Sequence, residues 1–304
     1  ILALIVVTLG CVAMANSTDT TRTIPQLRTG IPSAYDSAQS VKLLGKRLHA
    51  LLRGPAMRGA TVSAAVINVK TGEALFDLNG TQALTPASTT KLFSTAAAFY
   101  FQGKGATVNT EVLYDGTLSD GVITGNVYLV GNGDAMLTTP DLEYIADRIR
   151  AAGVRRITGS VLGDGFRFDD VPERSQYSGD GEVVQPLPPI TALTVNDGVV
   201  TVVVSNVGGT VRAQTVPTSA SLSVNVLGSK GRLSIRPITD AQGHTTFVVA
   251  GRPPAGRTLS RSFTMPRPAL TAAGIFASRL ASGGVVVNGT VAERAAPAGA
   301  TSLA

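Results

Sequence analysis

One stretch, from about residue 106 to residue 265, limits the possible folds of this chain more than any other part of it. Short apolar runs bounded by Gly, Asp or Asn follow one another there, at 107–114, 122–130, 157–162, 191–204, 221–226 and 245–249. Such runs between turn residues are typical of strands. A single helical pattern at 141–152, after Thr139-Pro140, interrupts them. The sequence therefore predicts a β-rich region of one or two domains.

The segments on both sides of this region combine helical and extended patterns. Helices are predicted at 37–52, 88–101 and 266–281, and strands at 61–69, 73–78 and 285–287. The helix at 88–101 is apolar enough that we expect it to be buried. We also expect 37–105 and 266–304 to belong to one α/β domain into which 106–265 is inserted. A chain of 304 residues, 44% of them hydrophobic, can bury the cores of two or three domains.

The charge pattern argues against nucleic acid as a partner. The net charge is +6, but Lys and Arg form no run of five, and the aromatic residues, 5% of the chain, do not interleave with them. We interpret the excess as a solvated basic surface, compatible with an anionic membrane or cell wall.

Thiol and metal chemistry are not expected in the folded part. Cys11 is the single cysteine and lies in the apolar N-terminal stretch, so no disulfide can form within the chain. His49 and His244 are far apart in the sequence, and we predict surface positions for both, not a zinc site or a Ser-His-Asp triad. No G-x-S-x-G motif occurs. We therefore expect neither a metal nor a cofactor.

An export signal is predicted at 1–15. Residues 1–12 are almost all apolar, and Ala13-Met14-Ala15 fits the small-x-small cleavage pattern. The stretch is short for a membrane span and lacks a charged start, which indicates that the chain begins inside the signal; an uncleaved anchor or a lipoprotein at Cys11 is the alternative. Residues 16–36, rich in Thr, Pro and Ser, are a predicted linker. We expect export to the periplasm or the extracellular cell wall, with a membrane contacted only through such an anchor.

The residues that point to chemistry are Ser88 and Lys91, an S-x-x-K pattern where a polar loop enters a helix. Three residues along a helix return a side chain to nearly the same face, so the Lys91 amine can lie beside the Ser88 hydroxyl. A serine hydroxyl needs a base to become a good nucleophile, and a buried lysine can lose its charge and act as that base. The helix start can also help to hold a tetrahedral oxyanion.

The pattern alone is weak, because S-x-x-K occurs by chance and a serine at a helix start can be a plain N-cap. Its context favours catalysis. A predicted export signal, a helix, a two-strand hairpin and a polar loop precede Ser88 in that order.

These elements and the large insertion after them resemble the low-molecular-mass class C penicillin-binding proteins, the D-alanyl-D-alanine carboxypeptidase/endopeptidase family. The run LVGNGDAMLT at 129–138 is similar to the family's G-G-G-D-P-x-L-T stretch, with Asn132 and Ala135 as departures. Asp164 and the run LTVN at 193–196 also look like family landmarks. The resemblance extends from about residue 37 to the end of the chain. It implies an α/β serine acyl-transferase domain, penicillin-binding/β-lactamase-like, with a large β-rich insertion after the S-x-x-K helix.

The family also implies two later motifs, S-x-N and K-T-G, on the C-terminal side of the insertion. Lys70-Thr71-Gly72 spells the last one but precedes Ser88 and occupies a turn, and Ser223-Val224-Asn225 spells the other but lies in a strand-like run of the insertion. We interpret both as chance matches. We therefore expect the chain to be a fragment whose catalytic domain is incomplete at its C-terminal end and which is inactive alone.

The function implied by the resemblance is acyl transfer on peptidoglycan stem peptides through an acyl-enzyme on Ser88, with β-lactams as inhibitors. Two alternatives remain: a β-lactamase, disfavoured by the long insertion, and an envelope protein of this fold that binds the cell wall without turnover.

Overall fold

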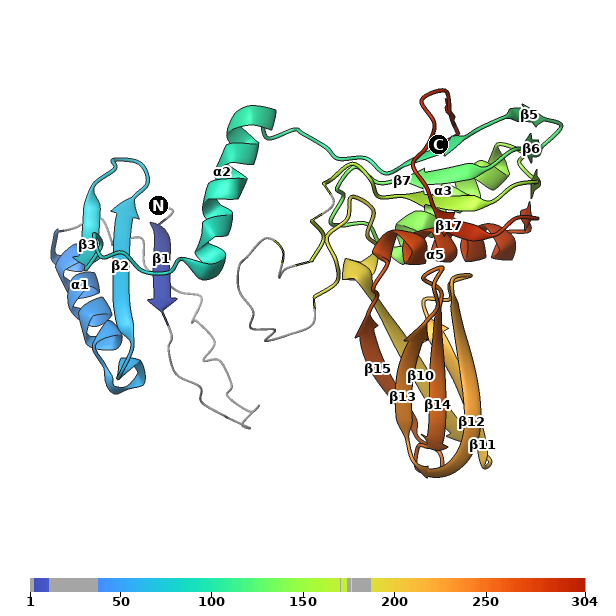
Figure 1. Ribbon diagram of the computed structural model, residues 1–304. Coiled ribbons are helices and arrows are strands. Elements are labelled where there is room, and N and C mark those ends of the chain that lie inside the picture. Colours follow the sequence, from blue (N-terminus) through green and yellow to red (C-terminus); the bar gives the residue numbers. More distant parts are fainter. Residues whose placement is uncertain (1–2, 11–37, 170, 174–175, 177–186, 304) are drawn as a thin grey trace. The chain divides into compact units, whose positions relative to one another are not determined.

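The computed structural model describes residues 3–10, 38–169, 171–173, 176 and 187–303 (Figure 1). The chain forms two compact units, Ile1–Ala106 and Thr107–Ala304. The predicted linker at 16–36 and the predicted cleavage motif at 13–15 lie outside the described residues.

A three-stranded antiparallel sheet with the order β1-β2-β3 organises the first unit. Val62, Ala64 and Val66 alternate along β2 and are buried together with Leu78 of β3, so one face of the sheet forms a small core. Helix α1 packs against β3. The elements are β1 (Ala3–Gly10), α1 (Ala38–Leu52), β2 (Thr61–Asn68), β3 (Ala74–Leu78) and α2 (Lys91–Gln102), with 3-10 turns at Pro55–Met57 and Ala87–Thr90.

Residues 3–10, predicted as the apolar part of an export signal, form strand β1. They pair along their whole length with β2, from Ala3 opposite Asn68 to Gly10 opposite Thr61. A run of apolar and β-branched residues suits a strand as well as a signal, because both require an apolar segment. Their role as a signal stays a prediction.

Helix α2 differs from the sequence-based expectation of a buried helix. Its predicted bounds hold within a turn, but none of its residues is buried. Phe93, Tyr100 and Phe101 are 75%, 84% and 81% exposed. Hydrophobic composition predicts that a helix needs an apolar partner, and within the described part of the first unit α2 does not have one.

Two sheets and two helices form the α/β part of the second unit. The sheets have the strand orders β17-β9-β7-β4-β18 and β16-β8-β6-β5. The predicted runs at 122–130 and 157–162 each divide into two strands, because the chain passes from one sheet to the other within each run. The elements are β4 (Glu111–Tyr114), β5 (Thr117–Ser119), β6 (Val122–Thr124), β7 (Val127–Val130), α3 (Thr139–Ala151), β8 (Arg156–Ile157), β9 (Val161–Asp164), α5 (Pro268–Ser282), β16 (Val286–Val287), β17 (Val291–Glu293) and β18 (Thr301–Ser302).

We expected the chain to return to the first domain at residue 266, and the structure differs from this expectation. Residues 266–304 lie in the second unit, where α5 packs against α3 and β9, and β16 and β17 pair in parallel with β8 and β9. Leu270, Ile275 and Phe276 of α5 are at most 1% exposed and belong to the main hydrophobic core. The α/β core of segment 106–265 is therefore completed by α5, which lies outside that segment.

A hydrogen-bond network fixes the end of β4 beside β7. The carboxylate of Asp115 accepts bonds from the backbone and side-chain nitrogens of Asn126 and, at 2.8 Å, from the hydroxyl of Tyr128. Burial acts to raise the pKa of Asp115, but these bonds and the charge of Arg294 together outweigh it and lower the pKa below its ordinary value. Burial and the same carboxylate raise the pKa of Tyr128. Asp115 thus serves as a structural acceptor.

The rest of the second unit is a two-sheet β-module, drawn in yellow to orange below α5 in Figure 1. Its sheets, ordered β11-β10-β15 and β12-β14-β13, enclose a core of Val200, Val202 and Val204 against Phe247 and Val249. Only β10, β12 and β14 were predicted, because the other strands mix Arg, Ser and Thr with few buried residues. The strands are β10 (Val199–Val207), β11 (Thr210–Val216), β12 (Leu222–Arg232), β13 (Ser234–Thr239), β14 (Thr245–Arg252) and β15 (Thr258–Thr264).

Candidate active site

Ser88 and Lys91 lie side by side, as the S-x-x-K spacing predicts. Ser88 belongs to the 3-10 turn Ala87–Thr90, which runs directly into α2, and Lys91 is the first residue of α2. The Lys91 amine donates a hydrogen bond to the Ser88 hydroxyl, with 3.4 Å between Nζ and Oγ. The backbone N–H of Lys91 is bonded to the carbonyls of Ser88 and Thr89, which fixes the turn. The local chain therefore holds a lysine amine within reach of the proton of a serine hydroxyl.

The surroundings of this pair are open. Ser88 and Lys91 are both exposed, whereas the sequence argument required a buried lysine for an amine that acts as a base. Thr89 is held by bonds of its N–H and its hydroxyl to the carbonyl of Pro86. The geometry thus supplies a nucleophile and an adjacent amine, and the apolar surroundings that would tune the amine are absent from the described residues around it.

The two sequences that spell later family motifs are used structurally. Lys70-Thr71-Gly72 forms the β2–β3 turn, where Gly72 has a φ of +75° and its N–H bonds to the Asn68 carbonyl. Ser223 and Asn225 lie in β12 of the other unit, and the Ser223 hydroxyl is 2.8 Å from that of Thr246 on β14. In the structure both matches occupy the turn and the strand that the sequence predicts.

Neither histidine is hydrogen-bonded to Ser88 in the described part of the chain. His49 is exposed in the last turn of α1. The prediction of a surface position is less accurate for His244, which is partly buried and has its Nε2 3.2 Å from the carbonyl oxygen of Val291.

The family-like runs in the second unit pack against each other. A Cβ on Gly131 would lie 2.3 Å from the carbonyl oxygen of Ala192, so only glycine fits there. Asn196 bonds to the N–H and hydroxyl of Thr139. Asn132, one of the departures from the family stretch, bonds to the Asn109 carbonyl. These runs hold the second unit together.

Asp164 has a similar structural use. Its carboxylate accepts the N–H groups of Phe166 and Ala296, which ties the end of β9 to the segment after β17.

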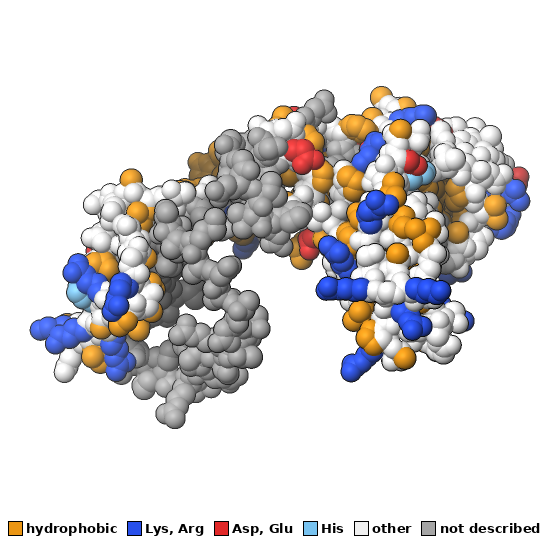
Figure 2. All heavy atoms as spheres, turned by 60° about the horizontal axis from the view of Figure 1, so that its bottom comes forward, with side chains coloured by type: hydrophobic (Ala, Val, Ile, Leu, Met, Phe, Trp, Pro, Cys, Tyr) orange, Lys and Arg blue, Asp and Glu red, His pale blue; other side chains and the backbone are white. Residues whose placement is uncertain are grey.

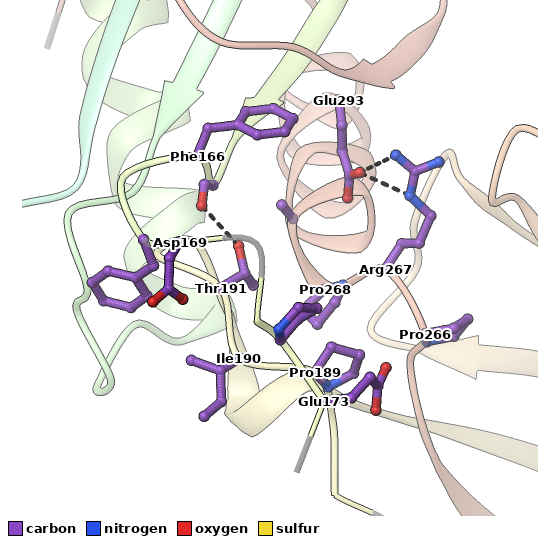
Figure 3. A pocket seen from close by; sticks show the side chains of 14 residues that line it. Phe166, Asp169, Glu173, Pro189, Ile190, Thr191, Pro266, Arg267, Pro268 and Glu293 are labelled. Atoms are coloured by element: carbon purple, nitrogen blue, oxygen red, sulfur yellow. Dashed lines mark hydrogen bonds and ion pairs between the residues drawn. The ribbon is translucent and has the colours of Figure 1, made fainter. Parts of the chain in front are cut away.

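A cavity of about 280 Å³ lies in the second unit between the loop after β9 and the start of α5 (Figure 3). Arg267 and Glu293 face each other at its wall and form an ion pair, with 2.8 Å from the arginine Nε to the glutamate Oε2. The other oxygen of Glu293 accepts the Leu270 N–H at the start of α5. This charge pair therefore stabilises the helix start. Sequence reasoning missed it, because no local pattern links residues 26 positions apart.

Comparisons with known proteins agree with the resemblance. A model of the D-Ala-D-Ala carboxypeptidase 3 (S13) family matches residues 44–304. A D-alanyl-D-alanine carboxypeptidase from Actinomadura sp. (strain R39) is 30% identical over 291 residues, which are 90% of this chain and 54% of that protein. D-alanyl-D-alanine carboxypeptidase DacB from Haemophilus influenzae is 26% identical over 106 residues, 35% of this chain and 22% of that protein. The chain spans about half the length of the Actinomadura relative.

Two crystal structures of penicillin-binding protein 4 from Haemophilus influenzae share the fold at 19% identity, both with a TM-score of 0.53. The first is complexed with a novel β-lactam. The matches cover 79% and 81% of this chain and 53% and 56% of those chains. The predicted class, an α/β penicillin-binding fold with a β-rich region, is confirmed by this likeness.

Proposed function

The chain belongs to the D-Ala-D-Ala carboxypeptidase 3 (S13) family, and on that basis we propose that it carries the nucleophile of a serine-type D-alanyl-D-alanine carboxypeptidase/endopeptidase acting on peptidoglycan stem peptides. The observation that supports the assignment of Ser88 and Lys91 is the 3.4 Å contact between the amine and the hydroxyl at the start of α2. The resemblance assigns the same two residues.

In the proposed reaction the Ser88 oxygen attacks the carbonyl carbon of the penultimate D-Ala while the Lys91 amine accepts the hydroxyl proton. Backbone N–H donors aimed at the carbonyl oxygen of the substrate would stabilise the oxyanion of the tetrahedral intermediate. The N–H groups of Thr89 and Lys91 are already bonded to carbonyl oxygens and do not serve in this arrangement. The C–N bond then breaks, and the leaving amine of the terminal D-Ala takes the proton. Water hydrolyses the resulting ester and restores the serine. A β-lactam follows the same first step, since its ring amide takes the place of the peptide bond.

We also propose that the protein is exported, to the periplasm or the extracellular cell wall, where its substrate lies. The apolar run at 1–12 and the small-x-small pattern at 13–15 support a signal or anchor. None of the helices in the described ranges combines the length and the apolar character that a membrane crossing requires.

The test is release of D-Ala from a peptide ending in D-Ala-D-Ala, measured on the gene product with any sequence that flanks this chain. Ser88→Ala should abolish release. Lys91→Arg keeps the charge but cannot accept a proton, so it should lower kcat at least about a hundredfold. Lys104→Arg, at an exposed lysine shortly after α2, is the matched control and should leave kcat unchanged.

Near-native release by Lys91→Arg would exclude Lys91 as the base. Rapid turnover of β-lactams with no release of D-Ala would indicate a β-lactamase, and binding of peptidoglycan without either activity would indicate an envelope-binding protein.

A further inference from the structure

The positive charge of the chain is concentrated in the β-module. Residues 199–264 contain seven Lys and Arg residues and one acidic residue, a net charge of +6. The whole chain has a net charge of +6, so the rest of the sequence is balanced. All seven cationic side chains are exposed, and none of them has an ion-pair partner among the described residues. Figure 2, which brings the lower end of Figure 1 forward, shows Lys and Arg side chains gathered on this module.

Three of these arginines belong to the sheet β12-β14-β13. Phe247 and Val249 of β14 are fully buried against the other sheet, so Val248 between them points outward. Arg236 of β13 is the register partner of Val248 and shares its outer face. Arg252 lies four residues further along β14 and, by the same alternation, on that face too. Arg232 of β12 is the register partner of Arg252. We call Arg232, Arg236 and Arg252, together with Lys230 and Arg257 at the same end, the basic face.

Two arginines of the basic face are neighbours without a counter-charge. Arg232 and Arg252 are register partners on the parallel strands β12 and β14. The single acid of the module, Asp240, lies at the other end of β14, where its carboxylate accepts the N–H groups of Gln242 and His244. No acidic side chain of the module is therefore placed to neutralise this pair.

The loop that follows β14 is held in place by hydrogen bonds to a buried residue of β10. Asn206 of β10 is 2% exposed and donates its side-chain amide to the Pro253 carbonyl at 2.9 Å. Its backbone bonds to Arg257 and Gly256 in the same loop, at 3.2 Å and 3.0 Å. The backbone that carries Arg252 and Arg257, on either side of the loop, is thus fixed before any ligand arrives, which reduces the backbone entropy lost on binding.

We propose that the basic face is a docking surface for a phosphodiester-containing anionic polymer of the cell wall, which holds the protein against its substrate. The proposal rests on the proposed function for the location of the protein. Six of the seven cations are arginine, whose planar guanidinium matches phosphate oxygens in a bidentate arrangement. A flexible polyanion can follow cations that are spread along a sheet and its end, whereas a single small anion would contact one or two of them.

Two other polyanions fit this face less well. A bilayer surface favours aromatic anchors among the cations, but the two aromatic residues of the module, Phe247 and Phe263, are buried and half-buried in its core. Single-stranded nucleic acid needs exposed aromatic platforms for its bases, which the module lacks for the same reason. Val207 and Leu227, each 67% exposed, are apolar side chains near the basic face, so lipid vesicles are the main competitor to be tested.

The experiment measures binding of the 304-residue chain to immobilised, purified poly(glycerol phosphate), with a variant in which Arg232, Arg236 and Arg252 are changed to Gln. The matched control changes Arg148, Arg150 and Arg156 to Gln. These exposed arginines lie on α3 and β8, and the control loses the same net charge. The basic-face variant should bind about tenfold more weakly or worse, and the control should bind nearly as the wild type does. Raising the salt from about 50 mM to about 500 mM should release the wild type, because the Debye length shrinks.

Equal weakening of both variants would overturn the proposal, since net charge alone would then explain binding. Absence of binding at low salt would overturn it too, as would tighter binding to phosphatidylglycerol vesicles than to the polymer. Ser88→Ala should bind the polymer as the wild type does. If D-Ala release fails while polymer binding follows the predicted pattern, the proposed function is wrong and the docking surface stands.

Discussion

Helices α2 and α5 have similar apolar compositions and opposite environments. Eleven of the fifteen residues of α5 are buried, whereas none of the twelve residues of α2 is. Helix α5 lies among strands and a second helix that belong to the same unit and close around it. Helix α2 begins at Lys91, directly after the turn that contains Ser88, and presents Phe93, Phe99 and Phe101 to solvent. The comparison teaches that apolar sequence predicts the need for a partner and not its presence.

The same contrast separates the two units. The second unit contains a large core formed by elements from both ends of its own sequence, 107–304. The first unit has a small core on one face of its sheet, and its helix α2 has no apolar partner among the described residues. The chain spans about half the length of its Actinomadura relative, and the apolar residues of α2 predict a packing partner that the described residues do not supply.

The largest effect is expected from removal of α5. A protein of residues 107–304 should fold cooperatively, and one of residues 107–265 should not, because the latter lacks the side chains of Leu270, Ile275 and Phe276 at the centre of the core. Circular dichroism during heating, with proteolysis as a second readout, measures the difference. Since the β-module has a core of its own, the decisive result is proteolysis: protection of 107–198 in the shorter protein would restore the boundary that the sequence predicts at residue 265.

A matched pair of substitutions sharpens the comparison of the two helices. Phe276→Ala in α5 should lower the free energy of unfolding of the second unit by about 3–5 kcal/mol, because it leaves a cavity in a fully buried site. Phe101→Ala in α2, at a side chain that is 81% exposed, should change stability by about 0.5 kcal/mol at most. Denaturant titration of the 304-residue chain gives both values. A large loss at Phe101 would mean that α2 is already packed.

A smaller effect is expected at Asp115, whose bonds to Asn126 and Tyr128 join β4 and β7. Because its folded pKa is lowered, its stabilisation is fully present above the unfolded pKa of about 3.9 and is lost as the pH falls through the folded value. Asp115→Asn should cost about 1–2 kcal/mol at neutral pH, since an accepting oxygen is lost. The difference from the wild type, measured by denaturant titration, should shrink below about pH 4. A constant difference down to pH 2 would contradict the assignment.

Sequence reasoning predicted the elements whose pattern is local. The helices at 37–52, 141–152 and 266–281, the β2–β3 hairpin and the Ser88–Lys91 pair each depend on residues close together in the chain. It missed what depends on distant partners. The exposure of α2, the place of α5 in the core and the Arg267–Glu293 pair are decided by tertiary packing. The edge strands β11, β13 and β15 were not predicted, because few of their residues are buried and their apolar pattern is weak.

Covalent labelling of Ser88 tests the central claim most directly. A penicillin is added to the 304-residue chain and, in parallel, to the gene product with any flanking sequence, and the labelled peptide is identified by mass spectrometry. We expect an adduct on Ser88 in the gene product and none in the chain alone, because Ser88 and Lys91 are exposed here and the two motif-like sequences lie in a turn and in the other unit. An adduct on any other serine would contradict the account. Acylation of the chain alone would return Lys70-Thr71-Gly72 and Ser223-Val224-Asn225 to consideration as working motifs.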